Sequence, residues 1–257
     1  MTTPPSLADL LATLGLHTTA AQLNDLIARA TKHRWSPTQL LEHVVRIEQD
    51  DRAHRGLERR LTRSRLGRFK PIADFDWTWP TQIDRDAVEA ALRLDFLATA
   101  RNIVLVAPQG LGKTMIAQNI GHQAVLAGHS VLFTTASQIL LDHAAQESAR
   151  ALDRRLRHYG TRTSLLVIDE IGYLSYDSRN ADLLFQVISR RHEKKSLVLT
   201  TNLAFSDWPT IFPNASSAIA LIDRVIHHAD ILRIEGSSFR AREAHATLSQ
   251  AKRRPKA

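Results

Sequence analysis

Two glycines, a lysine and a threonine in the middle of the chain have the spacing of a phosphate-binding loop. The stretch reads APQGLGKT and lies between an apolar run and a segment with helical spacing. Gly110 and Gly112 let backbone amides approach phosphate oxygens without a side chain in the way. Lys113 supplies a mobile charge for the β- and γ-phosphates, and the Thr114 hydroxyl can bind Mg²⁺. Ala107 stands where the pattern has its first glycine, which shapes the backbone only, so we expect alanine to weaken the loop little.

Two carboxylates end a second apolar run, LLVIDE, further along the chain. At the end of a buried strand, Asp169 would hold the magnesium shell and Glu170 would act as general base on the attacking water. A base that acts on water favours hydrolysis over transfer to a small metabolite. The alternative is that the two side chains are a solvated strand end, but their place after a phosphate-binding loop favours the functional interpretation.

An asparagine and an arginine further on are candidates for sensing and for stabilising charge. Asn202 follows a fourth apolar run and could reach the γ-phosphate or the lytic water, although asparagine after a strand also forms Asx turns. Arg224 lies on an amphipathic stretch and could reach the γ-phosphate of a neighbouring subunit, or it could simply pair with Asp223. His227 and His228 follow on the same stretch. Because adjacent helical positions point apart, we do not expect these two histidines to be ligands of one metal site, and we assign them no role.

The elements that must position these residues alternate between strand-like and helix-like patterns. Short apolar runs, rich in β-branched residues, occur at 102–106, 130–134, 164–168, 196–200 and 231–234. Helical stretches separate them, which predicts an α/β fold with a parallel sheet covered on both faces. Parallel strands bring their carboxyl ends to one edge of the sheet, where the candidate residues would meet.

The first part of the chain has helical patterns only. Helix-start signals occur at Ser6, at Thr19 and at Ser36, and each is followed by apolar residues at helical spacing. We therefore predict a small all-helical domain over residues 1–68 that binds DNA or a partner, followed by an α/β domain over 69–257 with a short basic tail. The linking stretch, KPIADFDWTWP, is expected to be extended and to pack onto the second domain.

Positive charge is concentrated at the ends of the chain. The net charge is +8, yet residues 1–70 hold 12 basic and 7 acidic residues, and the last ten hold four basic residues and no acid. Arg52, Arg55, Arg59 and Arg63 recur at three- and four-residue steps, so they share one face of a helix. A polyanion would relieve their repulsion, which favours a phosphate-contacting surface over a merely solvated face. The expected DNA-binding residues are Arg52, Arg55, Arg59, Arg60, Arg63 and Arg65.

Composition excludes several classes of protein. The chain has 257 residues and no cysteine, which removes disulfides, cysteine-ligated zinc and thiol catalysis. No apolar run has the length of a membrane span, and the N-terminus lacks the basic region of a signal peptide. We therefore expect a cytoplasmic protein with a sizeable core and no membrane partner.

These segments together resemble the AAA+ ATPases, and more narrowly the IstB-type ATP-binding helper proteins of insertion sequences, which are related to DnaC-type helicase loaders. The resemblance covers nearly the whole chain. It is carried by FKPIADFDW at 69–77, the loop at 107–114, LLVIDEIGYL at 165–174, TTNLAFSDWPTIF at 200–212 and LIDRVIHHADILRIEGSSFR at 221–240.

The resemblance implies a five-stranded parallel sheet in the order 5-1-4-3-2 with a reduced lid. It implies ATP and Mg²⁺ as cofactors, and an oligomer that assembles on duplex DNA, engages a transposase and is reset by hydrolysis. It also implies that Arg240 is a second sensor. The expected nucleotide-binding residues are Gly110, Leu111, Gly112, Lys113, Thr114, Met115, Asp169 and Arg240, with Thr114 and Asp169 also as magnesium ligands. The expected catalytic residues are Lys113, Glu170, Asn202 and Arg224.

Three alternatives compete with the transposition helper. A DnaC-like helicase loader would use the same nucleotide site, but its helical domain would bind a helicase rather than DNA. A small-molecule kinase is disfavoured by Glu170 and by the lack of an evident acceptor-binding lid. A regulatory nucleotide binder without turnover is disfavoured by the intact pair of Asp169 and Glu170.

Overall fold

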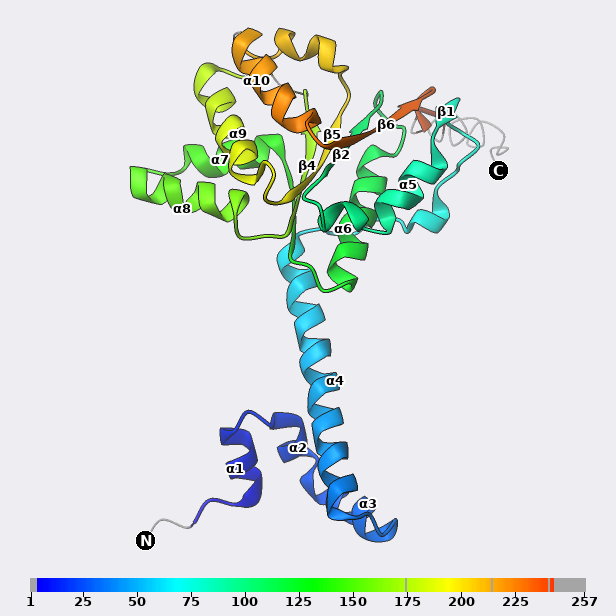
Figure 1. Cartoon of the computed structure of the whole chain (residues 1–257), viewed down its shortest axis with the longest axis vertical. Helices are drawn as coiled ribbons and strands as arrows, with labels where there is room; N and C mark the ends of the chain where they lie inside the picture. The colour runs from blue at the N-terminus through cyan, green and yellow to red at the C-terminus, as the bar shows by residue number, and fades with distance from the viewer. Residues whose placement is uncertain (1–3, 174, 214, 240, 243–257) are drawn as a thin grey trace, which may run out of the picture. The chain divides into compact units, whose positions relative to one another are not determined.

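A computed structural model of the chain describes residues 4–173, 175–213, 215–239 and 241–242 (Figure 1). Two compact units make up the chain, Met1–Arg59 and Arg60–Ala257. The division falls inside one helix, α4 (Pro37–Ser64), and the boundary expected between residues 68 and 69 stays a prediction. None of the helices in the described ranges is long and apolar enough to cross a membrane.

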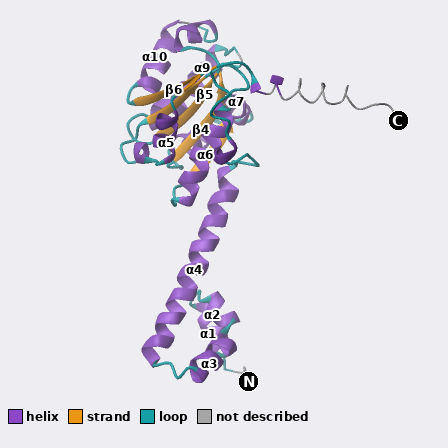
Figure 2. Cartoon of the chain, turned by 90° about the vertical axis from the view of Figure 1, so that its right-hand side faces the viewer, coloured by secondary structure: helices purple, strands orange, loops and turns teal. Residues whose placement is uncertain are grey.

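A mostly parallel sheet forms the centre of the second unit (Figure 2). Its strands lie in the order β1-β6-β2-β5-β4-β3. The strands are β1 (Gln82–Ile83), β2 (Asn102–Val106), β3 (Val131–Thr135), β4 (Leu165–Ile171), β5 (Ser196–Thr201) and β6 (Ala229–Glu235). The last five pair in parallel, and their order is the expected 5-1-4-3-2. The expectation of five strands is wrong by one. β1 adds an antiparallel edge strand to β6, and its two residues are too few to leave a periodic pattern in the sequence.

Helices cover both faces of this sheet (Figure 2). They are α5 (Arg85–Leu92), α6 (Lys113–Leu126), α7 (Ala136–Ala144), α8 (Ala149–Gly160), α9 (Ser178–Arg191) and α10 (Ala215–Ile226), with short 3₁₀ turns η1 (Ile72–Asp74), η2 (Asp95–Leu97) and η3 (Phe205–Thr210). Alternate strand residues such as Val104, Leu166 and Leu199 join one core cluster with α7, α9 and α10. Residues between them are also buried, so the strands are apolar on both sides.

The first unit is helical, as predicted. It contains α1 (Leu7–Thr13), α2 (His17–Ala21), α3 (Leu23–Lys32) and the first part of α4. Ser6 caps α1 in a capping box with Asp9, and the left-handed Gly15 (φ +78°) follows the helix end. A second capping box joins Ser36 and Gln39 at the start of α4, where the Gln39 amide donates to the Ser36 hydroxyl at 3.2 Å.

The start signal at Thr19 is wrong. Thr19 lies inside α2, and its amide donates to the Glu48 carboxylate at 2.7 Å, while α3 begins after Gln22 without a side-chain cap. Glu48 is buried on α4, and a buried acceptor needs a donor. The tertiary bond from α2 to α4 therefore replaces the local cap that the sequence pattern indicated.

The segment that links the helical region to the sheet packs as expected onto the rest of the second unit, but the expectation that it is extended is wrong, because Ile72–Asp74 form the 3₁₀ turn η1. The Ile72 amide donates to the Asn119 side chain of α6 at 2.9 Å, and Asn119 donates back to the Lys70 carbonyl at 3.0 Å. Phe75 is buried, and the Trp79 indole donates to the Ser237 carbonyl at 2.8 Å. The expected reduced lid concerns the chain beyond β6, where residues 240 and 243–257 lie outside the described part.

Candidate functional site

The phosphate-binding loop lies between the end of β2 and the start of α6. Gly110 (φ +79°) and Gly112 (φ +86°) both have left-handed backbones, which favour glycine. Gly112 precedes the first residue of α6, so the helix N-terminus faces the loop. Ala107 is buried without a left-handed backbone, and its amide donates to the Thr201 carbonyl at 3.1 Å. Its methyl group is thus accommodated without backbone strain.

Lys113 lies with its ammonium group against the loop itself. Its Nζ donates to the carbonyl of Ala107 at 2.6 Å and to that of Pro108 at 2.7 Å. The positive charge is thereby held at the mouth of the loop, where phosphate oxygens of a nucleotide would compete for it.

A set of oxygen atoms gathers beside the loop, between α6 and the ends of two strands. The Thr114 hydroxyl of α6 donates to Asp169 of β4 at 2.9 Å, and the Thr200 hydroxyl of β5 donates to the same carboxylate. Asp169 is buried, and these two hydroxyls supply hydrogen bonds to its carboxylate. Hydroxyl and carboxylate oxygens are the hard ligands that Mg²⁺ prefers, and Thr114 and Asp169 fit that ion.

Glu170 is positioned by a bulge in β4. Between Ile168 and Ile171 the strand has one residue more than the matching stretch of β5. Glu170 occupies the irregularity with a left-handed backbone (φ +61°), and its amide donates to the Thr200 hydroxyl at 3.0 Å. A non-glycine residue in this conformation costs free energy and is often found where a side chain must be aimed. The Glu170 side chain is exposed.

These residues share one cavity of about 230 Å³, together with Asn202. Asn202 follows β5 directly and is half-buried. The structure therefore brings together Lys113, Thr114, Asp169, Glu170 and Asn202 from three places in the sequence. The full lining is Gln109, Gly110, Lys113, Thr114, Asp169, Glu170, Tyr173, Thr200 and Asn202.

A second cavity of about 300 Å³ also borders the loop, and its lining includes the expected nucleotide-binding residues Leu111 and Met115, but sequence reasoning did not assign its aromatic walls to the site. Phe75, Trp79 and Phe239 line it beside Leu111 and Met115. The rings of Trp79 and Phe239 lie edge to face, with centroids 5.9 Å apart. Aromatic and apolar walls next to a phosphate-binding loop suit a nucleobase. The aromatic cluster in the linking stretch was the available signal, and it indicated packing only.

Asp76 lies in the same cavity and is held ionised. The Thr78 hydroxyl and amide donate to it at 2.6 and 3.1 Å, and they lower the pKa of its carboxyl group, with a smaller contribution from Arg242. Arg242 also lies over the Trp79 ring, 4.5 Å from its centroid.

Arg224 has a described position but is not part of either cavity lining. Arg224 lies near the end of α10, where it donates to the Ala220 carbonyl at 3.1 Å and covers the Phe185 ring at 4.5 Å. α10 leads into the first residues of β6, so Arg224 is at the opposite edge of the sheet from the phosphate-binding loop. Arg240 lies outside the described residues.

The predicted DNA-binding arginines lie on α4 or just after it. Arg52 and Arg59 are exposed in the first unit, where Arg55 forms an ion pair with Asp51 at 2.5 Å. In the second unit Arg63 and Arg65 are exposed, and Arg60 donates to the Val125 carbonyl at 3.3 Å. Exposed arginines therefore occur in both units, while Arg55 and Arg60 are already engaged with protein partners.

Fold and site together define a class of protein. A phosphate-binding loop after β2, an acidic pair in β4 and a polar residue after β5, on a sheet of this order, are the features of an AAA+ P-loop ATP-binding protein. The model of the IstB-like ATP-binding proteins matches residues 9–247. The chain belongs to this family, and ATP is the ligand of its loop.

Individual relatives agree with this assignment. A putative ATP-binding protein of insertion sequence IS21 from Pseudomonas aeruginosa is 34% identical over 234 residues, which cover 91% of this chain and 88% of that protein. The corresponding protein of insertion sequence IS5376 from Geobacillus stearothermophilus is 33% identical over 214 residues, or 83% and 85% of the two chains.

Solved structures support the fold. A crystal structure of DnaI matches with a TM-score of 0.53 and 16% identity, covering 66% of this chain and 92% of that one. The replication initiator DnaA, bound to AMPPCP and single-stranded DNA, matches with a TM-score of 0.50 and 16% identity, covering 71% and 58%. At these identities the likeness concerns the fold alone.

Proposed function

We propose that this chain is an ATP-hydrolysing transposition helper that assembles on duplex DNA, engages a transposase and is reset by hydrolysis. The observation that carries the proposal is the cavity shared by Lys113, Thr114, Asp169, Glu170 and Asn202. It combines phosphate-binding groups with the exposed carboxylate of Glu170. Relatives encoded by insertion sequences support the biological setting.

The loop and the first turn of α6 hold the triphosphate. Backbone amides at Gly110 and Gly112 donate to phosphate oxygens, and Lys113 moves its ammonium group from the loop carbonyls to the β- and γ-phosphates. Thr114 and Asp169 would hold Mg²⁺, which would neutralise charge on the β- and γ-phosphates when bound. The apolar cavity lined by Phe75 and Trp79 receives the base.

Glu170 accepts the proton of the attacking water. Its exposed side chain lines the cavity, and the Thr200 hydroxyl accepts a hydrogen bond from the Glu170 amide, which fixes the backbone at this position. Asn202, on the neighbouring strand, orients the water or the γ-phosphate by hydrogen bonding. These roles require the two strand ends to keep their register, and the Thr200 hydroxyl links them by donating to Asp169 and accepting from the Glu170 amide.

Two features support assembly and DNA binding. Arg224 lies at the sheet edge opposite its own ATP site, as a residue that completes the site of a neighbouring subunit would. The exposed arginines of the α4 region can neutralise DNA phosphates without reading bases. We propose that ATP-bound subunits associate along the duplex and that the assembly recruits the transposase.

The first experiment measures binding to random-sequence duplex DNA in a salt series, with ADP and with a non-hydrolysable ATP analogue. Tighter, cooperative and sequence-indifferent binding with the analogue is expected, and the salt dependence gives the number of phosphate contacts. Lys113→Ala is expected to abolish the difference between the two nucleotides. Absence of duplex binding in both states would contradict the helper role and favour a DnaC-like helicase loader.

A further inference from the structure

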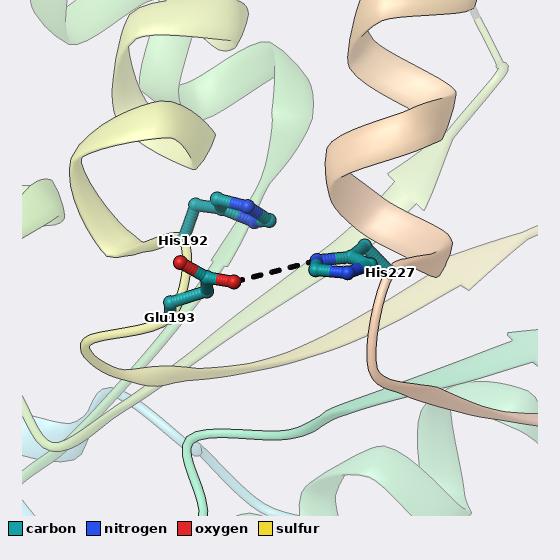
Figure 3. Close-up of side chains that lie close together, drawn as sticks. All are labelled: His192, Glu193 and His227. Carbon is teal, nitrogen blue, oxygen red and sulfur yellow. Dashed lines mark ion pairs between the residues drawn. The ribbon is translucent and has the colours of Figure 1, made fainter.

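Three side chains that could bind a metal ion converge at the edge of the sheet opposite the ATP site. His192 and Glu193 follow the end of α9, and His227 follows the end of α10 (Figure 3). One ligand atom from each lies within 4.8 Å of the other two. The Glu193 carboxylate faces His227 Nδ1 at 3.7 Å and His228 Nε2 at 4.0 Å.

From the sequence we expected His227 and His228 to lie on a continuous helix, so that their side chains point apart. In the structure the helix ends before them. α10 ends at Ile226, and His228 has a left-handed backbone (φ +57°). The rings of His227 and His228 are consequently close, with centroids 4.0 Å apart. Glu193 has the same left-handed conformation (φ +57°), and in both places the irregular backbone turns adjacent side chains to a common side.

We propose that His192, Glu193 and His227 form a binding site for a divalent transition-metal ion of the Zn²⁺ type. Two imidazole nitrogens and one carboxylate oxygen are ligands that Zn²⁺ accepts at about 2.0–2.2 Å. Imidazole also favours such ions over Mg²⁺ and Ca²⁺, which prefer oxygen ligands. Small rotations of the side chains bring the three atoms to the separation that a tetrahedral ion requires. Water or His228 completes the coordination.

The surroundings of the cluster favour a cation. α9 and α10 both end there, so the negative ends of two helix dipoles point toward the site. Two neighbouring cationic side chains have other partners: Arg191 donates to the Tyr159, Thr163, Ser164 and Ser196 carbonyls, and Lys195 Nζ donates to the Thr161 carbonyl. Lys194 is exposed on the surface.

This site is independent of the proposed ATPase. It uses none of the residues that line the two cavities beside the phosphate-binding loop. A bound ion would join the end of α9 to the end of α10 and so restrain the turn that leads into β6.

The test is a titration of the untagged, chelator-treated full chain with Zn²⁺ by calorimetry, in excess Mg²⁺. The wild-type chain is expected to bind one Zn²⁺ per chain without competition from Mg²⁺. His227→Ala and Glu193→Gln, both at exposed positions, are expected to lower the affinity at least about tenfold. His54→Ala is the matched control, because His54 and Glu58 form an exposed pair at 3.2 Å that is not part of the cluster.

A second measurement uses Co²⁺ and the His192→Asn variant. Visible absorption of a low-coordinate Co²⁺ site is expected for the wild-type chain and its loss for the variant, while circular dichroism confirms that the variant is folded. The proposal is overturned if the wild-type chain has no saturable site for one ion. It is equally overturned if His227→Ala binds as tightly as wild type, or if His54→Ala loses as much affinity.

Discussion

Thr200 is the residue that joins the two carboxylates of the ATP site. Its hydroxyl donates to Asp169 and accepts from the Glu170 amide, so one side chain sets the position of both. Sequence patterns did not single it out, because a threonine at the end of a strand is common and its role depends on two neighbours from another strand.

A substitution of Glu170 should separate ATP binding from ATP hydrolysis more clearly than any other single change. Glu170→Gln keeps the shape of the side chain but cannot accept a proton from water, so the variant should bind ATP and hydrolyse it about a hundredfold to ten-thousandfold more slowly. Nucleotide binding by fluorescence and phosphate release are the measurements. Turnover at the wild-type rate would show that Glu170 is not the base.

Gly112 is a position where conformation and space both require glycine. A Cβ atom there would lie 2.5 Å from the ring of the buried Phe75, and the backbone is left-handed. Gly112→Ala should therefore lose more stability than the roughly 1–2 kcal/mol of a left-handed alanine alone, and should also weaken ATP binding. Thermal and urea unfolding, with a nucleotide titration, are the measurements.

Gly128→Ala is the matched control for this substitution. Gly128 has a similar backbone (φ +93°), but a Cβ atom at this position would meet nothing within 4 Å. Gly128→Ala should therefore lower the free energy of unfolding by the cost of a left-handed alanine, without any change in ATP affinity. Equal effects of the two substitutions would contradict a specific role for the packing against Phe75.

At the scale of elements, the strands were predictable and their irregularities were not. Each of the five apolar runs is a strand within a few residues, because a parallel sheet buries both faces and leaves a continuous apolar signal. The bulge at Glu170 and the two-residue β1 depend on pairing with distant strands, which no local pattern records. The loop and the acidic pair were found from their spacing, and Asn202 from its place after a strand, whereas Thr200 and the aromatic walls required the fold.

Helix α4 gives the element-scale test of DNA binding. The double variant Arg52→Ala/Arg59→Ala removes two exposed charges and should lower the slope of log affinity against log salt by about 0.9 for each phosphate that is no longer neutralised. Fluorescence anisotropy with a labelled duplex is the measurement. Arg150→Ala/Arg154→Ala removes two exposed arginines of α8 and should leave the slope unchanged. Equal slopes for wild type and the α4 variant would exclude these phosphate contacts.

At the scale of the whole molecule, two histidines shielded from water make stability depend on pH. Burial lowers the pKa of His143 and of His158, and nearby Arg155 lowers both further. His143 Nδ1 lies 2.5 Å from the Ile139 carbonyl, while its Nε2 has no partner among the described residues, so a second proton there would be costly.

The sign of this dependence follows from proton binding. The unfolded chain binds protons at histidine near the ordinary pKa of 6.5, whereas the folded chain binds them only at lower pH. The free energy of unfolding should therefore fall as pH decreases below about 6.5, by up to about 1.4 kcal/mol per pH unit for each group. Urea unfolding between about pH 7.5 and pH 5 measures it. His143→Leu should reduce the slope, and exposed His54→Ala should not.

The proposed role of Arg224 can be tested only in an assembly, because the arginine would act on the ATP site of a neighbouring subunit. Arg224→Ala and Lys113→Ala should each lose nearly all DNA-stimulated turnover, the first for lack of the arginine and the second for lack of a working loop. If Arg224 acts on a neighbouring subunit, an equal mixture should recover up to about a quarter of the wild-type rate, since about one interface in four, among all that form, joins an intact loop to an intact arginine. No recovery in mixtures that do assemble would contradict action between subunits.

The hydrogen bonds from Lys113 to the carbonyls of Ala107 and Pro108 change the meaning of a measured affinity. The ammonium group of Lys113 is not free in solvent before ATP binds. The phosphates of ATP must replace the two backbone carbonyls as its hydrogen-bond acceptors. The heat and free energy of binding therefore report an exchange between two sets of acceptors, and only their difference is observed. The reduction in affinity caused by Lys113→Ala will be smaller than the direct attraction between lysine and phosphate.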